Sequence, residues 1–378
     1  MYVIKAVKKT SLIRYALLIF CIVLLCAAFG IVQNHDRQVI AQQGTETEPD
    51  WTSILGSLFS QRDSQVLSGD TDALQSMFLT DERNGQYAYE NEVFRSRYLR
   101  SWAEKQGVSL QNISSRISIV RSKEVGRGYA FYLIVSTEYT YCYPDDPQTL
   151  NMFRMGAYHS IDLIPGDSSS QWIISREWYD DPMTKSFSAE AYTPETTEYI
   201  AAQSPADLSG LSEARLAAVQ YADTYCGAAS DGSNGYKYNN EYTDYNPLGG
   251  NCANFASQAL YEGGGFKKNG TWNYRAGKGS RAWINAQGFK DYLLYSGRGE
   301  LIARGKYSDV YKASYQLRPG DIVAYAHKGD TSHISIVTGQ DSKGYPLVNS
   351  HNLDRYRVPW DIGWNTDSYS FYLIRVNY

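Results

Sequence analysis

The chain has 378 residues, of which 43% are hydrophobic and 20% are charged, and its formal net charge is −4. These proportions are ordinary for globular proteins, and the length predicts about two domains with a sizeable core. The first 32 residues carry +4, so the remainder of the chain carries −8. An acidic chain of this kind offers no basic groove, and we expect no nucleic-acid partner.

An uncharged, apolar run at residues 15–32 dominates the N-terminus. It is long enough to cross a bilayer. The basic residues beside it, Lys5, Lys8, Lys9 and Arg14, all precede it, which predicts that the rest of the chain is exported. We therefore predict a cytoplasmic basic segment and a transmembrane signal anchor at residues 1–32. The protein would cross the cell membrane once, with extracellular C-terminal domains, or would be secreted if cleaved near Ala41.

A polar linker, residues 33–49, leads to a first domain at residues 50–179. In this domain, helical periodicity comes first and alternating strand patterns follow. Helices before an antiparallel meander predict an α+β domain. The order of elements resembles the cone-shaped domain related to nuclear transport factor 2 (cystatin-like), and we expect a spacer or docking module. His159 lies inside a predicted strand and is expected to be structural.

Residues 180–207 are rich in Pro, Thr, Ser and Asp and are predicted to be an interdomain linker. The second domain, residues 208–378, contains a glycine pair followed by Cys252 and a helical apolar face. A thiol at a helix N-terminus faces unpaired backbone N–H groups and the positive end of the helix dipole. Both favour the nucleophilic thiolate. A buried core cysteine would give the same pattern.

Outside the apolar run the chain has Cys142, Cys226 and Cys252, so at least one thiol is free or bonded to another molecule. A disulfide between Cys142 and Cys226 stays open, because spacing alone does not test its geometry.

Strands are predicted at residues 322–326, 333–339 and 345–351, with a turn at 341–344 between the last two. His333 opens the second of these strands. Alternation places Asn349 and His351 on one face of the third, and both fall within reach of His333 across the hairpin. The pattern does not separate these two positions.

The sequence motifs of this region resemble those of the putative amidase domain family, which is similar to papain-like exported hydrolases, including cell-wall peptidases and CHAP amidases. The resemblance covers residues 211–378. It departs from the family's usual pattern at Asn251 and Ala253, where Asp and Thr are common. The motif residues are Asn251-Cys252-Ala253-Asn254-Phe255-Ala256-Ser257-Gln258, Gly263-Gly264, Pro319-Gly320-Asp321, His333 to Gly339, and Pro346-Leu347-Val348-Asn349-Ser350-His351.

The resemblance implies a papain-like α+β domain and amide hydrolysis through a thioester, without a cofactor. Cys252 would be the nucleophile, and His333 would accept and return its proton. Asn349, or otherwise His351, would orient the imidazole. The backbone N–H of Cys252, with Asn251 as a further donor, would hold the oxyanion. Peptidoglycan or another peptide or amide substrate would be the partner.

Two alternatives remain at this point. A zinc hydrolase could use His327, His333 and His351 as three ligands with one open position. The domain could instead bind cell-wall material without cleaving it, because a family fold does not guarantee activity.

Overall fold

The structure is a computed structural model that describes residues 49–168, 171–185, 193–364 and 368–378. Residues Trp51–Tyr378 form one compact unit. The predicted membrane span at residues 15–32 lies outside the described residues. Within the described ranges, no helix has both the length and the apolar character needed to cross a membrane.

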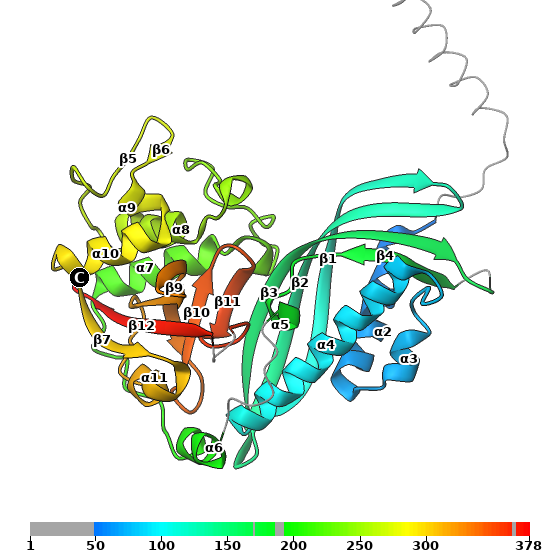
Figure 1. Ribbon diagram of the computed structural model, residues 1–378, viewed down its shortest axis with the longest axis horizontal. Helices are drawn as coiled ribbons and strands as arrows, with labels where there is room; N and C mark the ends of the chain where they lie inside the picture. Colours follow the sequence, from blue (N-terminus) through cyan, green and yellow to red (C-terminus); the bar gives the residue numbers. More distant parts are fainter. Residues whose placement is uncertain (1–48, 169–170, 186–192, 365–367) are drawn as a thin grey trace, which may run out of the picture. The chain divides into compact units, whose positions relative to one another are not determined.

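The N-terminal half has the predicted order, with helices followed by an antiparallel meander (Figure 1). Apolar residues of the helices and of one sheet face, among them Phe59, Trp102 and Leu133, share one buried core. The opposite sheet face is therefore free of these helices. The elements are α2 (Trp51–Ser68), α3 (Thr71–Gln75), α4 (Arg83–Gln106), β1 (Ser109–Val125), β2 (Gly128–Tyr143), β3 (Asp146–Pro165) and β4 (Trp172–Trp178).

The stretch predicted as a linker, residues 180–207, contains α5 (Pro182–Lys185) and α6 (Pro194–Ala201). Met183 and Ile200 are fully buried, and the Tyr199 ring lies edge-on to Tyr311 of the C-terminal half at 5.5 Å between ring centroids. The described part of this stretch thus packs into the core. The domain boundaries themselves stay a prediction.

The C-terminal half is also α+β. Its strands include those predicted around 322–326, 333–339 and 345–351, together with others that were not predicted from the sequence. The elements are α7 (Glu213–Thr224), η1 (Gly227–Ala229), η2 (Asn246–Leu248), α8 (Cys252–Gln258), η3 (Ala259–Gly263), β5 (Tyr274–Arg275), β6 (Lys278–Gly279), α9 (Arg281–Ile284), α10 (Ala286–Tyr295), β7 (Gly299–Gly305), α11 (Tyr307–Ser314), β8 (Ile322–His327), β9 (Asp330–Gln340), β10 (Pro346–Ser350), β11 (Asp354–Pro359) and β12 (Tyr369–Val376).

Both halves contribute to one large antiparallel sheet. Its strand order among the described residues is β1-β2-β3-β11-β10-β9-β8-β12-β7, with β4 paired to β3. The halves meet where Gly156 of β3 pairs with Asp354 of β11. Gly156 permits this junction, because a Cβ there would come within 2.1 Å of the backbone of Ala228.

A buried polar cluster also joins the halves. Lys105 of α4 forms an ion pair with Asp361, and the Lys105 Nζ lies 3.4 Å from the Tyr345 hydroxyl. Tyr143 of β2 donates a hydrogen bond of 2.7 Å to Asp341. Because buried charges are costly unless they are paired, these contacts fix how the halves fit together.

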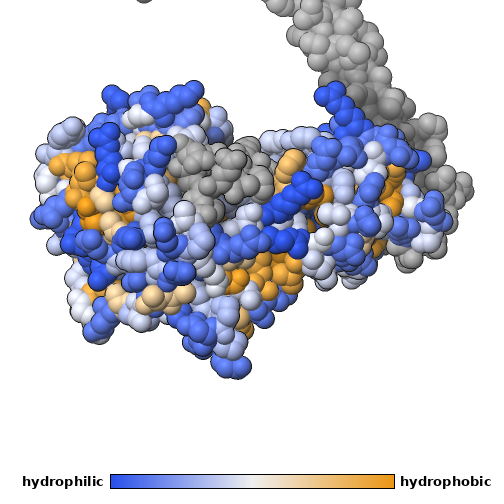
Figure 2. Space-filling model, turned by 60° about the horizontal axis from the view of Figure 1, so that its bottom comes forward, coloured by the Kyte–Doolittle hydropathy of each residue, from blue (hydrophilic) through white to orange (hydrophobic). Residues whose placement is uncertain are grey.

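On the face shown in Figure 2, hydrophilic residues cover most of the surface and hydrophobic residues gather in separate patches. Exposed apolar side chains scattered in this way are normal for a folded protein. These patches therefore do not indicate a binding partner.

Candidate active site

A pair of glycines leads into the helix that begins at Cys252. Gly249 and Gly250 have φ angles of 112° and 144°, which a residue with a Cβ rarely adopts. The chain then enters α8, whose residues are all buried, and the Cys252 side chain is 6% exposed. The predicted helix start at the cysteine is confirmed.

The Cys252 thiol lies against the backbone of β9. Burial raises the pKa of this thiol to about 11, while the backbone N–H groups of Ile334, Ala253 and Cys252 itself oppose the rise. The expectation of a lowered pKa at a helix start is wrong, because desolvation of the buried sulfur outweighs those N–H groups. At neutral pH the free protein holds a thiol here, and a base must remove its proton before it can attack.

His333 is the residue directly before Ile334 on β9. Its ring lies 5.0 Å from the Trp364 ring and 5.5 Å from the Tyr325 ring between centroids. Burial, with smaller effects of Arg355 and His351, lowers the pKa of His333 well below 6.5. Its Nε2 has no hydrogen-bond partner among the described residues. His333 is therefore a neutral imidazole with a ring nitrogen available for a proton or a ligand.

His351 contacts the start of α8 and holds Asn251, the residue before Cys252. Its ring is stacked between Tyr238 and Phe255, with centroids 3.8 and 4.0 Å away. Burial lowers the pKa of His351 to about 3, so the ring is neutral. Its Nε2 lies 2.7 Å from the Tyr225 carbonyl and must donate to it. Its Nδ1 then accepts from the Asn251 amide at 2.8 Å.

Asn251 is fixed by further bonds. Its Oδ1 accepts from the Asn254 side chain at 2.8 Å, and its backbone N–H donates to Asn352 Oδ1. The Asn251 side chain thus stabilises the loop that precedes Cys252. Asn352 was not among the predicted site residues. It has a φ of 66°, a left-handed conformation that asparagine tolerates better than most residues.

Asn349, the first choice for orienting His333, faces away from it. A bulge in the pairing of β9 with β10 sets Val348 opposite Val337 and Asn349 opposite Ile336. His333 and Ile336 point to opposite faces of β9, because strand side chains alternate. The Asn349 side chain bonds to Thr338 at 2.8 Å and to Asp223 at 2.9 Å. Among the described residues, no hydrogen bond links His333 to Asn349 or His351.

A cleft of about 750 Å³ opens beside His333, with lining from both halves of the chain. Cys252 is not among the residues that line this cleft. Two lining residues are linked to its surroundings. His333 is adjacent in sequence to Ile334, whose N–H faces the sulfur, and Asn352 accepts a hydrogen bond from the backbone N–H of Asn251. The described lining residues are Tyr132, Gly156, Ala157, Tyr158, Trp178, Asp180, Tyr238, Asp244, Asn246, Pro247, Ser332, His333, Asn352, Leu353, Asp354 and Trp364.

The comparisons with known proteins bear on this region. Residues 212–374 match the family model described as the putative amidase domain. The C-terminal half therefore matches this family, as its motifs indicated. No curated protein and no solved structure matches the chain. The matched residues run from just before α7 into β12, so they include Cys252, His333 and the whole of β9 and β10. An amidase domain supports a hydrolase function for this half.

The three histidines of the zinc alternative do not form one site in the amidase domain. Both ring nitrogens of His351 are hydrogen-bonded, and His327 stacks on Tyr369 with 5.2 Å between ring centroids. Within the described ranges, no group of three or more His, Cys, Asp or Glu residues could hold a metal ion. Cys142 and Cys226 are buried free thiols, so the disulfide left open by the sequence is not formed.

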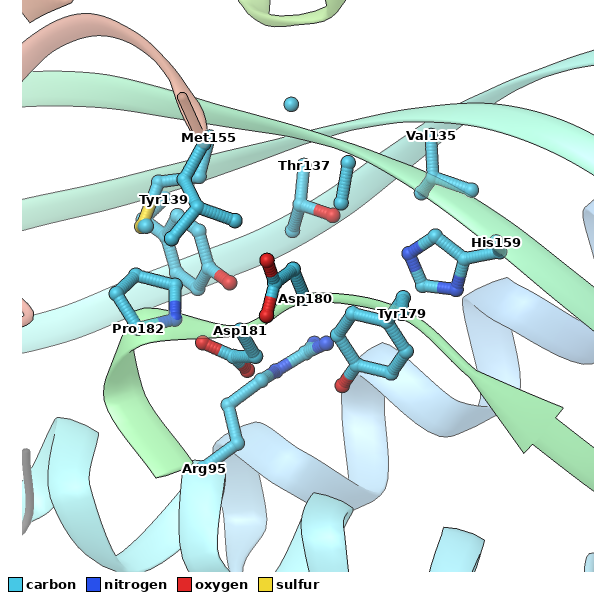
Figure 3. Close-up of a pocket in the computed structure, with 13 residues that line it drawn as sticks. Arg95, Val135, Thr137, Tyr139, Met155, His159, Tyr179, Asp180, Asp181 and Pro182 are labelled. Atoms are coloured by element: carbon cyan, nitrogen blue, oxygen red, sulfur yellow. The ribbon is translucent and has the colours of Figure 1, made fainter. Parts of the chain in front are cut away.

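A smaller cavity, about 30 Å³ in volume, lies in the N-terminal half between Arg95, His159, Tyr179 and Asp181 (Figure 3). It has room for water but not for a substrate. His159 lies 2.6 Å from Glu177, a carboxylate partner that the sequence analysis missed because β3 and β4 bring it close only in the fold. Arg62 also binds Glu177 at 2.7 Å, so this histidine belongs to a buried ion-pair cluster.

Proposed function

We propose that this protein is a cysteine-dependent amidase whose amidase domain hydrolyses amide bonds through a thioester intermediate. The observation that carries the proposal is that a neutral thiol and a neutral imidazole lie on two elements in contact, α8 and β9. Cys252 begins α8 with its sulfur facing the N–H of Ile334. His333, the residue directly before Ile334, has an unpartnered Nε2 among the described residues and lies beside a large cleft. The proposal requires the His333 Nε2 to come within hydrogen-bond reach of the Cys252 sulfur when the substrate is bound, as a base does with its nucleophile in other covalent hydrolases.

In the first half-reaction, His333 takes the Cys252 proton as the sulfur forms a bond to the substrate carbonyl carbon. The backbone N–H of Cys252 holds the oxyanion at the helix start. His333 then protonates the leaving nitrogen as the C–N bond breaks, which releases an amine and leaves a thioester. In the second half-reaction, His333 takes a proton from water, whose oxygen attacks the thioester carbon. Cys252 leaves as a thiolate and regains the proton.

We assign positioning roles to the two residues that the sequence offered as orienting groups. His351 acts through Asn251, because its Nδ1 accepts from the amide of the residue before the nucleophile. Asn349 acts further away, by holding β10 to Thr338 and to Asp223. Trp364 and Tyr325 confine the His333 ring by packing instead of hydrogen bonding.

The remaining features of the proposal rest on sequence. A nucleophilic cysteine at a helix start with a histidine on a neighbouring strand is typical of papain-like hydrolases, and the N-terminal meander with its helices resembles the domain related to nuclear transport factor 2. The run at residues 15–32 supports a single-pass anchor with the amidase domain outside the cell membrane. Peptidoglycan is then the substrate that such an enzyme would meet.

The pH profile of kcat/KM tests the thiol–imidazole pair. Between the pKa of His333, well below 6.5, and that of Cys252, about 11, both groups keep the protonation state that the mechanism uses. We therefore expect kcat/KM to be constant between about pH 7 and pH 9. His333→Ala removes the base, and the residual rate should rise about tenfold per pH unit with the thiolate fraction. A wild-type rate that itself rises tenfold per pH unit would contradict His333 as the base.

A further inference from the structure

An exposed aromatic surface continues the cleft onto the N-terminal half. Tyr132 of β2, Tyr158 of β3 and Trp178 of β4 are 38%, 37% and 58% exposed. Ser160 pairs with both Tyr132 and Trp178, which puts all three on one sheet face, because Tyr158 is two residues before Ser160. The Tyr132 and Tyr158 rings are stacked, with centroids 6.0 Å apart and planes 16° from parallel.

This face is the one that the helices of the N-terminal half, α2, α3 and α4, leave uncovered. The alternate residues, such as Leu133 and Ile161, are fully buried in the core beneath α2 and α4. On β4, Glu177 points to the buried face and accepts a hydrogen bond from Arg62 of α2. The next residue, Trp178, points to the opposite, uncovered face. Large aromatic side chains are thus held in the open by strands that are fixed from behind.

The same aromatic residues line the cleft that contains His333. The pairing of Gly156 with Asp354 explains the proximity: Tyr158 follows Gly156 by two residues, and Asn352 precedes Asp354 by two. A molecule bound in the cleft therefore touches both the meander and the amidase domain. This continuity gives the N-terminal half a place in substrate binding that the sequence analysis did not identify.

The lining chemistry selects the class of ligand. Beside the aromatic rings the cleft offers amides and carboxylates, including Asn246, Asn352 and Asp244. Its described lining residues include no lysine or arginine. Without positive charge it does not suit a phosphate-bearing chain. Sugar rings fit it, because their C–H faces stack on aromatic rings while their hydroxyl and acetamide groups exchange hydrogen bonds with amides and carboxylates.

We propose that Tyr132, Tyr158 and Trp178 form a carbohydrate subsite for the glycan part of the substrate, which holds a sugar-linked peptide with its amide near His333. The assignment of this subsite to the enzyme's substrate rests on the proposed amidase function. The binding of a sugar at these three residues does not depend on catalysis. The N-terminal half would then be part of the substrate-binding cleft, in addition to any spacer role.

The test is a binding titration of the full chain carrying Cys252→Ala. The ligand is a soluble oligomer of N-acetylglucosamine, and binding is measured by tryptophan fluorescence or by calorimetry. We expect saturable binding that Trp178→Ala weakens about tenfold or more, with a similar loss for Tyr158→Ala. Tyr87→Ala is the matched control, because Tyr87 is 52% exposed outside the cleft, and its binding should equal that of the parent.

Melting temperatures of all variants show whether the fold is kept, which is expected for exposed side chains. Binding that Trp178→Ala and Tyr158→Ala leave unchanged, or no saturable binding at millimolar oligomer, would overturn the carbohydrate subsite. Because the parent is already without its nucleophile, this result is independent of hydrolysis. Sugar binding by a chain that cleaves no amide would leave the subsite standing and refute only the amidase proposal.

Discussion

Replacing Cys252 with Ala should lower the rate of amide hydrolysis by at least about 10³-fold, because the covalent step loses its nucleophile. His333→Ala should cause a loss of similar size at neutral pH, since Cys252 is a thiol there and needs a base. The measurement is the rate of fragment release from peptidoglycan by the full chain, with melting temperatures to show that each variant folds.

Cys142→Ala is the control for this experiment. Cys142 is a buried free thiol on β2, in the half of the chain that lacks the amidase domain. Its removal should leave the rate close to that of the wild type. A Cys252→Ala variant that keeps its activity would show that the buried sulfur is a core residue, which is the alternative that the sequence left open.

Breaking the buried ion pair between the halves should have the largest effect on stability. Lys105→Met leaves the Asp361 carboxylate buried beside the Tyr345 hydroxyl, 2.9 Å away, without its cation. Loss of one partner from a buried pair costs about 3–5 kcal/mol in the free energy of unfolding. Urea denaturation of Lys105→Met, Asp361→Leu and the double variant measures this cost and the coupling between the two residues.

The double variant should be less destabilised than the sum of the single variants, because it buries no unpaired charge. The control is Lys343→Met. Lys343 binds Asp145 across the same two halves at 2.6 Å, but this carboxylate is exposed to solvent, and little stability should be lost. Additive effects at Lys105 and Asp361 would contradict the view that this pair couples the halves.

The sequence predicted the elements that depend on local pattern. The glycine pair before Cys252 marked a tight entry into a helix, and alternation from His333 onward marked a strand; both are present in the structure. Local patterns did not predict the pairing of β3 with β11. These strands are about 200 residues apart in sequence, and neither contains a pattern that specifies its partner strand or register.

Two errors at the site have physical causes that are not visible in the sequence. The bulge in the pairing of β9 with β10 shifts the register by one residue, so Asn349 lies opposite Ile336 and not on the His333 face. The pKa of Cys252 depends on how deeply the fold buries the sulfur, and that burial is tertiary. Tyr132, Tyr158 and Trp178 were missed because they belong to the other half of the chain.

The most direct test of the amidase proposal is product analysis in water enriched in heavy oxygen. The full chain is incubated with purified peptidoglycan, with and without a chelator, and the released fragments are analysed by mass spectrometry. The thioester mechanism predicts new amine ends, new carboxylate ends that carry the heavy oxygen, and no effect of the chelator. Fragments without a labelled carboxylate, or activity that the chelator abolishes while Cys252→Ala keeps it, would contradict cysteine-dependent amide hydrolysis.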